Sequence, residues 1–129
     1  MTEETHTVLA VDDDFASLEV LALLLKGEGF EVLTAYSGEE ALTRLADVSV
    51  DLLIIEYKMP KMDGSELCRR LLADERLSQI PVIFTSATYR RDVPRPPNVT
   101  AFFSKPLLFP ELLHSLHEIL GGSVTRPGA

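Results

Sequence analysis

Short apolar runs alternate along this chain with segments of helical periodicity, and this alternation is the feature that most restricts its fold. Four runs have the continuous apolar character of strands buried on both faces of a sheet: Val8–Val11, Leu52–Ile55, Pro81–Phe84 and Ala101–Phe103. A fifth run, Glu31–Ala35, alternates more and fits an edge strand. The order of strands and helices predicts right-handed βαβ units, and therefore an α/β fold whose parallel sheet is covered on both faces.

Amphipathic segments between these runs predict the covering helices. Apolar residues recur at helical spacing in four places: Leu18–Leu25, Ala41–Leu45, Leu67–Leu72 and Leu112–Leu120. Ser37 followed by Glu40 matches a capping box at the start of the second of these. Between the fourth and fifth strands, three prolines in Tyr89–Asn98 forbid a regular helix. We expect a loop or one short turn there, where the pattern requires a helix.

Length and charge limit the class of protein. The chain of 129 residues has the size of one domain, which we expect at residues 7–120, after a disordered segment 1–6 and before a flexible tail 121–129. Its longest apolar run, Val20–Leu25, is too short to cross a bilayer, and its polar start shows no secretory signal. A single cysteine suits a reducing cytoplasm. The net charge of −8 argues against broad binding to nucleic acid or anionic membranes.

Polar side chains follow the apolar runs at the points where the predicted strands end: Asp12–Asp14, Glu56, Thr85, Ser86 and Lys105. The carboxyl ends of parallel strands meet at one edge of a sheet, where ligands bind in such folds. Carboxylates suit Mg²⁺, and a lysine with a hydroxyl suits a phosphoryl oxygen. The alternative is that these residues only cap the following helices, which is the role we expect for Asp14.

At these positions the sequence resembles the receiver domain of two-component response regulators. The resemblance covers about Thr7 to Leu120, and its most specific parts are Met59-Pro-Lys-Met-Asp-Gly64 and Lys105-Pro106. It implies a flavodoxin-like three-layer (βα)5 sandwich with a five-stranded sheet in the order 2-1-3-4-5. It also implies these site residues: Asp12 and Asp13 as the acidic pocket for Mg²⁺, Ser86 as the switch hydroxyl, Phe102 as the switch aromatic, Lys105 as the characteristic lysine, and a cis bond before Pro106.

The sequence departs from the family pattern at the position of the phosphoacceptor aspartate, which aligns with Glu56. The extra methylene moves the carboxylate by roughly 1 Å, and a misplacement of that size can cost about a hundredfold in rate. Three interpretations stay open: Glu56 is a fixed mimic of the phosphorylated state, a relic in a docking module, or an acceptor that is still phosphorylated. A second departure is the proline-rich segment in place of the fourth helix.

We therefore expect an atypical single-domain receiver in phosphorelay signalling that is not phosphorylated at Glu56 and works as a constitutive protein–protein interaction module, not as an enzyme. It should need no cofactor and bind Mg²⁺ only weakly through Asp12 and Asp13. We expect a protein partner: a histidine kinase, another signalling protein or an effector in trans. The expected contact surface includes Arg90, Arg91 and Arg95.

Two alternatives concern assembly and chemistry. The chain is expected to be a monomer or a weak homodimer, and a homodimer would use the same arginine-bearing surface. Asp12 and Asp14 also resemble the first motif of haloacid-dehalogenase-like phosphatases, with one aspartate as nucleophile and the other as general acid/base. That interpretation lacks the late acidic pair that such enzymes need for Mg²⁺, because the only acidic residues after Lys105 are Glu111 and Glu118 on the last helix.

Overall fold

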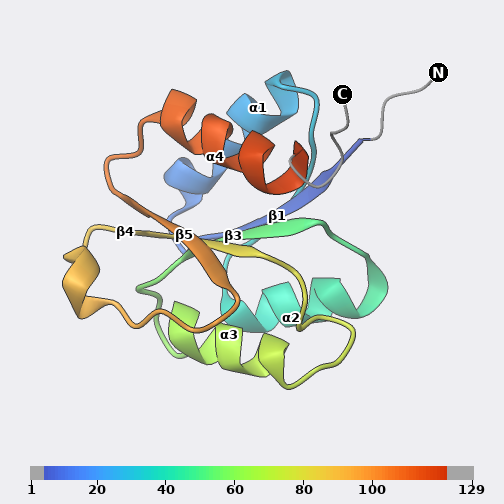
Figure 1. Cartoon of the computed structure of the whole chain (residues 1–129), viewed down its shortest axis with the longest axis vertical. Helices are drawn as coiled ribbons and strands as arrows, with labels where there is room; N and C mark the ends of the chain where they lie inside the picture. Colours follow the sequence, from blue (N-terminus) through green and yellow to red (C-terminus); the bar gives the residue numbers. More distant parts are fainter. Residues whose placement is uncertain (1–4, 122–129) are drawn as a thin grey trace.

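The protein folds around one parallel β-sheet, shown in Figure 1 for the computed structural model, which describes residues 5–121. The sheet order is β2-β1-β3-β4-β5, and each pair of neighbouring strands is parallel. The strands are β1 Thr7–Val11, β2 Glu31–Ala35, β3 Leu52–Glu56, β4 Val82–Ser86 and β5 Val99–Ser104. The predicted sheet order and the edge position of Glu31–Ala35 are confirmed.

Helices cover both faces of the sheet, α1 and α4 on one face and α2 and α3 on the other (Figure 1). Their bounds are α1 Phe15–Gly27, α2 Gly38–Asp47, α3 Gly64–Leu72 and α4 Phe109–Gly121. Because alternate residues of a strand point to opposite faces, β3 supplies Leu52 and Ile54 to one apolar cluster and Leu53 and Ile55 to the other. This three-layer arrangement is the flavodoxin-like α/β class that the sequence predicted.

The segment between β4 and β5 contains one turn of 3₁₀-helix, η1 Arg90–Asp92, instead of an α-helix. The prolines that follow exclude a longer helix, as predicted. Val93 is buried in the core and holds the segment against the sheet. Residues 5–121 therefore contain four α-helices, one fewer than the family resemblance implies, and the last of them is labelled α4.

Two helix starts differ in detail from their prediction. The side chain of Ser37 caps α2 by accepting a hydrogen bond of 3.0 Å from the backbone N–H of Glu40. The carboxylate of Glu40 accepts its return bond from the N–H of Tyr36, one residue before the one a capping box uses. Asp14 lies at the N-cap of α1, but its carboxylate accepts from the hydroxyl of Ser17 and caps no backbone N–H. The expected capping bond of Asp14 was therefore wrong.

The segment from Met59 to Gly64 has a structural role in the turn between β3 and α3. Met59 and Met62 are buried, and Asp63 caps α3 by accepting from the N–H of Glu66 at 2.9 Å. A Cβ at Gly64 would approach both the Phe84 ring and the backbone of Tyr57 to 3.0 Å. Glycine is needed here because the turn packs directly against the end of the sheet.

The predicted disordered segment 1–6 and tail 121–129 fall largely outside the described residues. Thr5 and His6 lead into β1 without regular structure, and Gly121 is the last residue of α4. Over residues 5–121, the structure has no helix with the length and apolar character that a membrane span requires.

Candidate functional site

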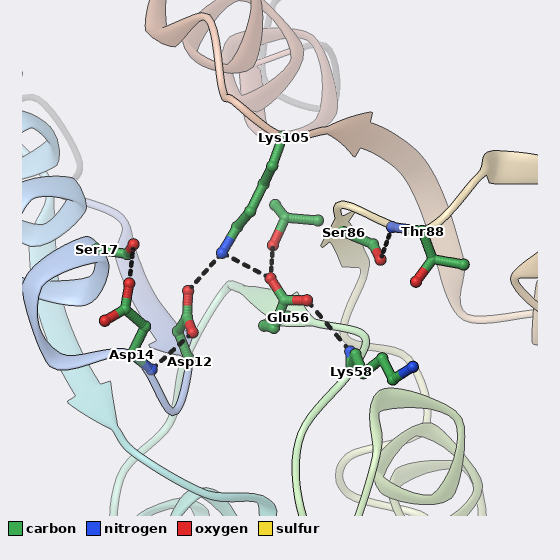
Figure 2. Close-up of polar contacts among 9 residues, drawn as sticks. Asp12, Asp14, Ser17, Glu56, Lys58, Ser86, Thr88 and Lys105 are labelled. Carbon is green, nitrogen blue, oxygen red and sulfur yellow. Dashed lines mark hydrogen bonds and ion pairs between the residues drawn. The ribbon is translucent and has the colours of Figure 1, made fainter.

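Lys105 links two carboxylates at the carboxyl edge of the sheet. Its Nζ lies 2.9 Å from Oδ2 of Asp12, which follows β1, and 2.7 Å from Oε1 of Glu56, the last residue of β3 (Figure 2). Asp12 and Glu56 are buried, whereas the Lys105 side chain keeps 25% of its surface exposed. The backbone N–H of Lys105 also donates to the carbonyl of Ser86 at 2.9 Å. This bond attaches the start of the segment between β5 and α4 to the end of β4. The peptide bond from Lys105 to Pro106 is cis.

Both oxygens of each carboxylate have a hydrogen-bond donor. Oε1 of Glu56 accepts from Lys105 and, at 3.4 Å, from the hydroxyl of Thr85, while Oε2 accepts from the backbone N–H of Lys58 at 3.2 Å. In Asp12, Oδ2 accepts from Lys105 and Oδ1 accepts from the N–H of Asp14 at 2.9 Å. We call Asp12, Glu56 and Lys105 the ion-pair cluster.

The charge of Lys105 is fixed by two opposing effects. Burial on its own lowers the pKa of the ammonium, because the charged form loses hydration. Hydrogen bonds and charge attraction from Glu56 and Asp12 more than offset that loss, so the pKa of Lys105 lies above its ordinary value of 10.5. Lys105 is therefore a permanent cation at neutral pH.

The structure does not bring every predicted site residue into the cluster. Asp13 is exposed and makes no hydrogen bond or ion pair with any residue in the range 5–121. Ser86 is buried, and its hydroxyl accepts from the N–H of Thr88 at 2.9 Å instead of facing Glu56. Phe102 is buried on β5, with the guanidinium of Arg90 over its ring at 5.6 Å.

Thr85 is the site residue to which the sequence assigned no role. It directly opposes Glu56 in the pairing of β3 with β4, and so its hydroxyl reaches the carboxylate. The register of these two strands was the signal that could have identified it. The sequence shows that Thr85 and Ser86 end the same strand, but it does not show which of them faces β3.

The donor set does not fit Mg²⁺ in this arrangement. The Lys105 ammonium lies between the two buried carboxylates, where a cation would have to bind. Of the three carboxylates Asp12, Asp13 and Glu56, only that of Asp13 has no hydrogen bond or ion pair within residues 5–121. Within residues 5–121, no group of three or more His, Cys, Asp or Glu side chains is arranged to hold a metal ion. A divalent ion would first have to displace Lys105 from Asp12 and Glu56.

The three predicted partner-loop arginines lie on one exposed segment at the β5 edge of the molecule (Figure 1). Arg90 covers Phe102, and the Arg91 guanidinium lies over the Tyr89 ring at 5.3 Å. Arg95 has no ion pair with any residue of the described range. We call residues 89–97 the arginine loop.

These features define a doubly wound α/β protein with a carboxylate–lysine cluster at the carboxyl edge of its sheet. Residues 8–117 match the response regulator receiver domain family, and the chain belongs to that family. The chain is thus a receiver domain of two-component signalling, and its response-regulator relatives are signalling proteins.

Two relatives and one solved structure show the extent of the similarity. The chain is 36% identical over 80 residues to the DNA-binding response regulator MtrA of Mycobacterium tuberculosis, a match that covers 62% of this chain and 34% of MtrA. It is 28% identical over 120 residues to the polar-differentiation response regulator DivK of Brucella ovis, covering 91% of this chain and 98% of DivK. The match thus spans about a third of the length of MtrA and nearly all of DivK.

The solved structure is the signal receiver domain of a signal transduction histidine kinase from Syntrophus aciditrophicus. It has a TM-score of 0.81 at 28% identity, and the alignment covers 97% of this chain and 96% of that one. The same domain fold therefore occurs in response regulators and within a kinase chain.

Proposed function

We propose that this chain is an atypical receiver that acts without phosphorylation of Glu56, as a constitutive protein–protein interaction module. The observation that carries the proposal is the ion-pair cluster. A permanent carboxylate at the acceptor position already holds Lys105 at 2.7 Å, and both of its oxygens accept hydrogen bonds from the protein.

Phosphoryl transfer requires a free carboxylate oxygen in line with the donor. Oε1 of Glu56 accepts from the Lys105 ammonium and from Thr85, and Oε2 accepts from the N–H of Lys58, so each oxygen shares electron density with a donor and is a weaker nucleophile. The extra methylene adds a misplacement of roughly 1 Å, which by itself can cost about a hundredfold in rate. Both effects oppose phosphorylation.

Constitutive action follows from the lack of a changing signal at the site. A protein moves between two states only when a ligand binds them differently, and the Glu56 carboxylate is a covalent part of the chain that is neither added nor removed. The Ser86 hydroxyl accepts from Thr88, and Phe102 lies under Arg90, while the side-chain hydrogen bonds of Glu56 go to Lys58, Thr85 and Lys105. A carboxylate carries −1 against about −1.5 to −2 for a phosphoryl group, so we assign neither an active nor an inactive state to the cluster.

The arginine loop is the proposed contact surface. Its guanidinium groups offer planar sets of donors to carboxylates, and its prolines reduce the conformational entropy that the loop loses on binding. The partner is a protein with an acidic surface that acts in trans in the cytoplasm, such as a kinase or an effector. The net charge of −8 disfavours nucleic acid and anionic membranes as partners.

Phosphotransfer tests this proposal directly. The chain is incubated with acetyl phosphate and Mg²⁺, and its intact mass is measured, with a receiver that carries the acceptor aspartate as the positive control. We expect no gain of a phosphoryl group in the wild type. A stable gain that disappears in Glu56→Gln would show that Glu56 is a working acceptor and that the chain is a conventional receiver.

The contacts of Asp14 favour the receiver over the phosphatase interpretation. Its backbone N–H donates to Asp12, and its carboxylate accepts from the hydroxyl of Ser17 at the surface. Turnover of a generic phosphomonoester that is lost in Asp12→Asn would reverse this conclusion.

A further inference from the structure

The outer face of α1 is apolar, although a surface helix usually presents polar residues to solvent. Its inner residues pack against the sheet, but Val20, Leu23 and Leu24 on the other side are 58%, 73% and 42% exposed. The helix thus has a second apolar face, which no other segment of the described chain covers.

The exposed residues form a stripe of the kind that packs against another helix. Ala16, Val20, Leu23 and Gly27 are exposed and follow one another at spacings of four, three and four residues, which keeps them on one side of α1. We call these four residues the outer stripe. Val20 of the stripe, Leu24 and Leu107 help to line a groove of about 410 Å³ that gives a partner's side chains room to pack. The other end of this groove reaches Asp12 and Lys105 of the ion-pair cluster.

One flank of the outer stripe carries a pair of opposite charges. Glu19 and Lys26 are seven residues apart, which is two helical turns, and so they lie on the same side of α1. Both are exposed, and neither makes an ion pair with a residue in the range 5–121. Lys26 is the one cation on α1. This flank is therefore complementary to its own reversed copy.

We propose that α1 mediates homodimerisation, with the outer stripes of two copies packed antiparallel about a two-fold axis near the middle of the helix. This axis passes between Glu19 and Lys26 and keeps the same flank of both helices on one side. Glu19 of each copy then lies opposite Lys26 of the other copy, and Leu23 lies beside its own equivalent. A parallel two-fold pairing would place the charged flanks on opposite sides, where they do not meet.

The charge pattern identifies a second copy as the occupant of this face. An unrelated helix could cover the apolar stripe, but two opposite charges on the same flank, two helical turns apart, complement the reversed chain itself. A helix of this length is only about 20 Å long, so the contact is at the small end of stable interfaces. The dimer is accordingly weak, with a dissociation constant roughly in the range 10–100 μM.

The outer stripe is separate from the arginine loop, and the substitutions that test it leave Glu56 and Lys105 unchanged. The loop follows β4 at the β5 edge, whereas α1 lies in the layer that also contains α4 (Figure 1). The homodimer can therefore be tested independently of the proposed function.

Sedimentation velocity of the full chain from low micromolar to millimolar concentration tests the apolar stripe. We expect a monomer–dimer equilibrium for the wild type and at least a tenfold weaker dimer for Leu23→Glu. Val48→Glu is the matched control, because Val48 is an exposed apolar residue next to α2 in the opposite layer. Leu23 is largely exposed, so its substitution should leave the thermal unfolding midpoint nearly unchanged.

Charge reversal tests the antiparallel pairing. Glu19→Lys and Lys26→Glu should each weaken the dimer about tenfold, because each places like charges opposite one another at both symmetric contacts. The double variant should recover the wild-type affinity, and an equimolar mixture of the two single variants should form a heterodimer at least as well as the wild type forms its homodimer.

The proposal is wrong if the wild type stays monomeric at millimolar concentration, or if a dimer forms that is indifferent to Leu23→Glu and to the charge reversals. It is equally wrong if the chain stays monomeric and a helical segment of a histidine kinase binds α1 in a manner lost in Leu23→Glu. That result would assign the stripe to another protein.

Discussion

Lys105 holds together the polar edge of the sheet. Asp12 and Glu56 lie on neighbouring strands and are both buried, so their negative charges would repel each other without the ammonium between them. Removing one member of a buried charge cluster is costly mainly because the remaining charges lose their partner. The stability of this edge should therefore depend on one side chain.

We predict that Lys105→Met lowers the free energy of unfolding by about 2–3 kcal/mol near neutral pH, below the largest values for buried pairs because Lys105 is partly exposed. Urea denaturation measures the change. Lys58→Met is the control, since the exposed Lys58 side chain has no ion pair with the described residues and its backbone bond to Glu56 survives. Equal effects of the two substitutions would contradict the proposed role of the cluster.

The difference in unfolding free energy between the wild type and Lys105→Met should also depend on pH in a defined way. The pKa of Lys105 is raised above 10.5 in the folded state by Glu56 and Asp12, in spite of burial. A group with a raised pKa contributes stability that is fully present below its unfolded pKa and is lost as the pH rises through the folded value. The stability difference between the wild type and Lys105→Met should thus stay constant from pH 7 to about 10 and decrease only above that range.

At the scale of single residues, the sequence predicted which side chains reach the edge but not how they pair. Asp12 follows β1, Glu56 ends β3 and Lys105 follows β5, so their convergence follows from the topology alone. β5 is a half-buried edge strand, so the prediction that Ala101–Phe103 is buried on both faces was wrong. Whether Thr85 or Ser86 faces Glu56 depends on strand register and pleat, which no local pattern specifies. Every oxygen of the two carboxylates also accepts at least one hydrogen bond, which only the three-dimensional arrangement reveals.

At the scale of elements, the strands were easier to predict than the segment that replaces the fourth helix. Buried parallel strands give continuous apolar runs, and β3 and β4 are buried at every position. The prolines excluded a long helix after β4, but they did not reveal that Val93 anchors the loop or that Arg90 packs over Phe102. These are long-range contacts with β5 and the core, and periodicity does not encode them.

We predict that the double reversal Arg91→Glu and Arg95→Glu weakens binding of the protein partner at least tenfold while changing the unfolding midpoint by about 1 °C or less. Both side chains are exposed and neither contacts the core, so their loss costs the fold little. Arg90 is left intact because it packs over Phe102. Pull-down and titration with the captured partner measure the effect.

The double reversal Arg69→Glu and Arg70→Glu is the control for this prediction, because it makes the same charge change on α3, on a different face of the molecule. The ion pairs of both arginines with Glu66 are exposed and contribute little stability. If binding survives the loop reversals but is lost in Asp13→Lys, the partner recognises the carboxylate edge of the sheet and the arginine loop is not the contact surface.

At the scale of the whole molecule, this chain keeps the sheet order and the three layers of the receiver fold. Its sequence has Glu56 where the resemblance implies an aspartate, and one 3₁₀ turn lies where the resemblance implies a fourth helix. The fold does not need either feature for stability, because the core consists of the two apolar clusters on the faces of the sheet. A receiver scaffold can therefore stay stable with a glutamate at this position and without a fourth helix.

Mg²⁺ should have little effect on the stability of the whole protein. A ligand stabilises the folded state by RT ln(1 + [L]/Kd), so a site with a dissociation constant above roughly 10 mM contributes less than about 0.3 kcal/mol at 5 mM ion. For a domain of this size, that corresponds to a shift of the unfolding midpoint of about 1 °C. We predict a shift no larger than this for the wild type, because Lys105 already neutralises Asp12 and Glu56.

Lys105→Met should reverse this behaviour. With the ammonium gone, Asp12, Asp13 and Glu56 leave three carboxylates at the edge with no cation among them, and Mg²⁺ should raise the unfolding midpoint of the variant by several degrees. Thermal unfolding with and without Mg²⁺, with NaCl matching the ionic strength, separates specific binding from screening of the net charge of −8. A submillimolar Mg²⁺ affinity in the wild type would show that the ion displaces Lys105, and that the cluster is a working metal site.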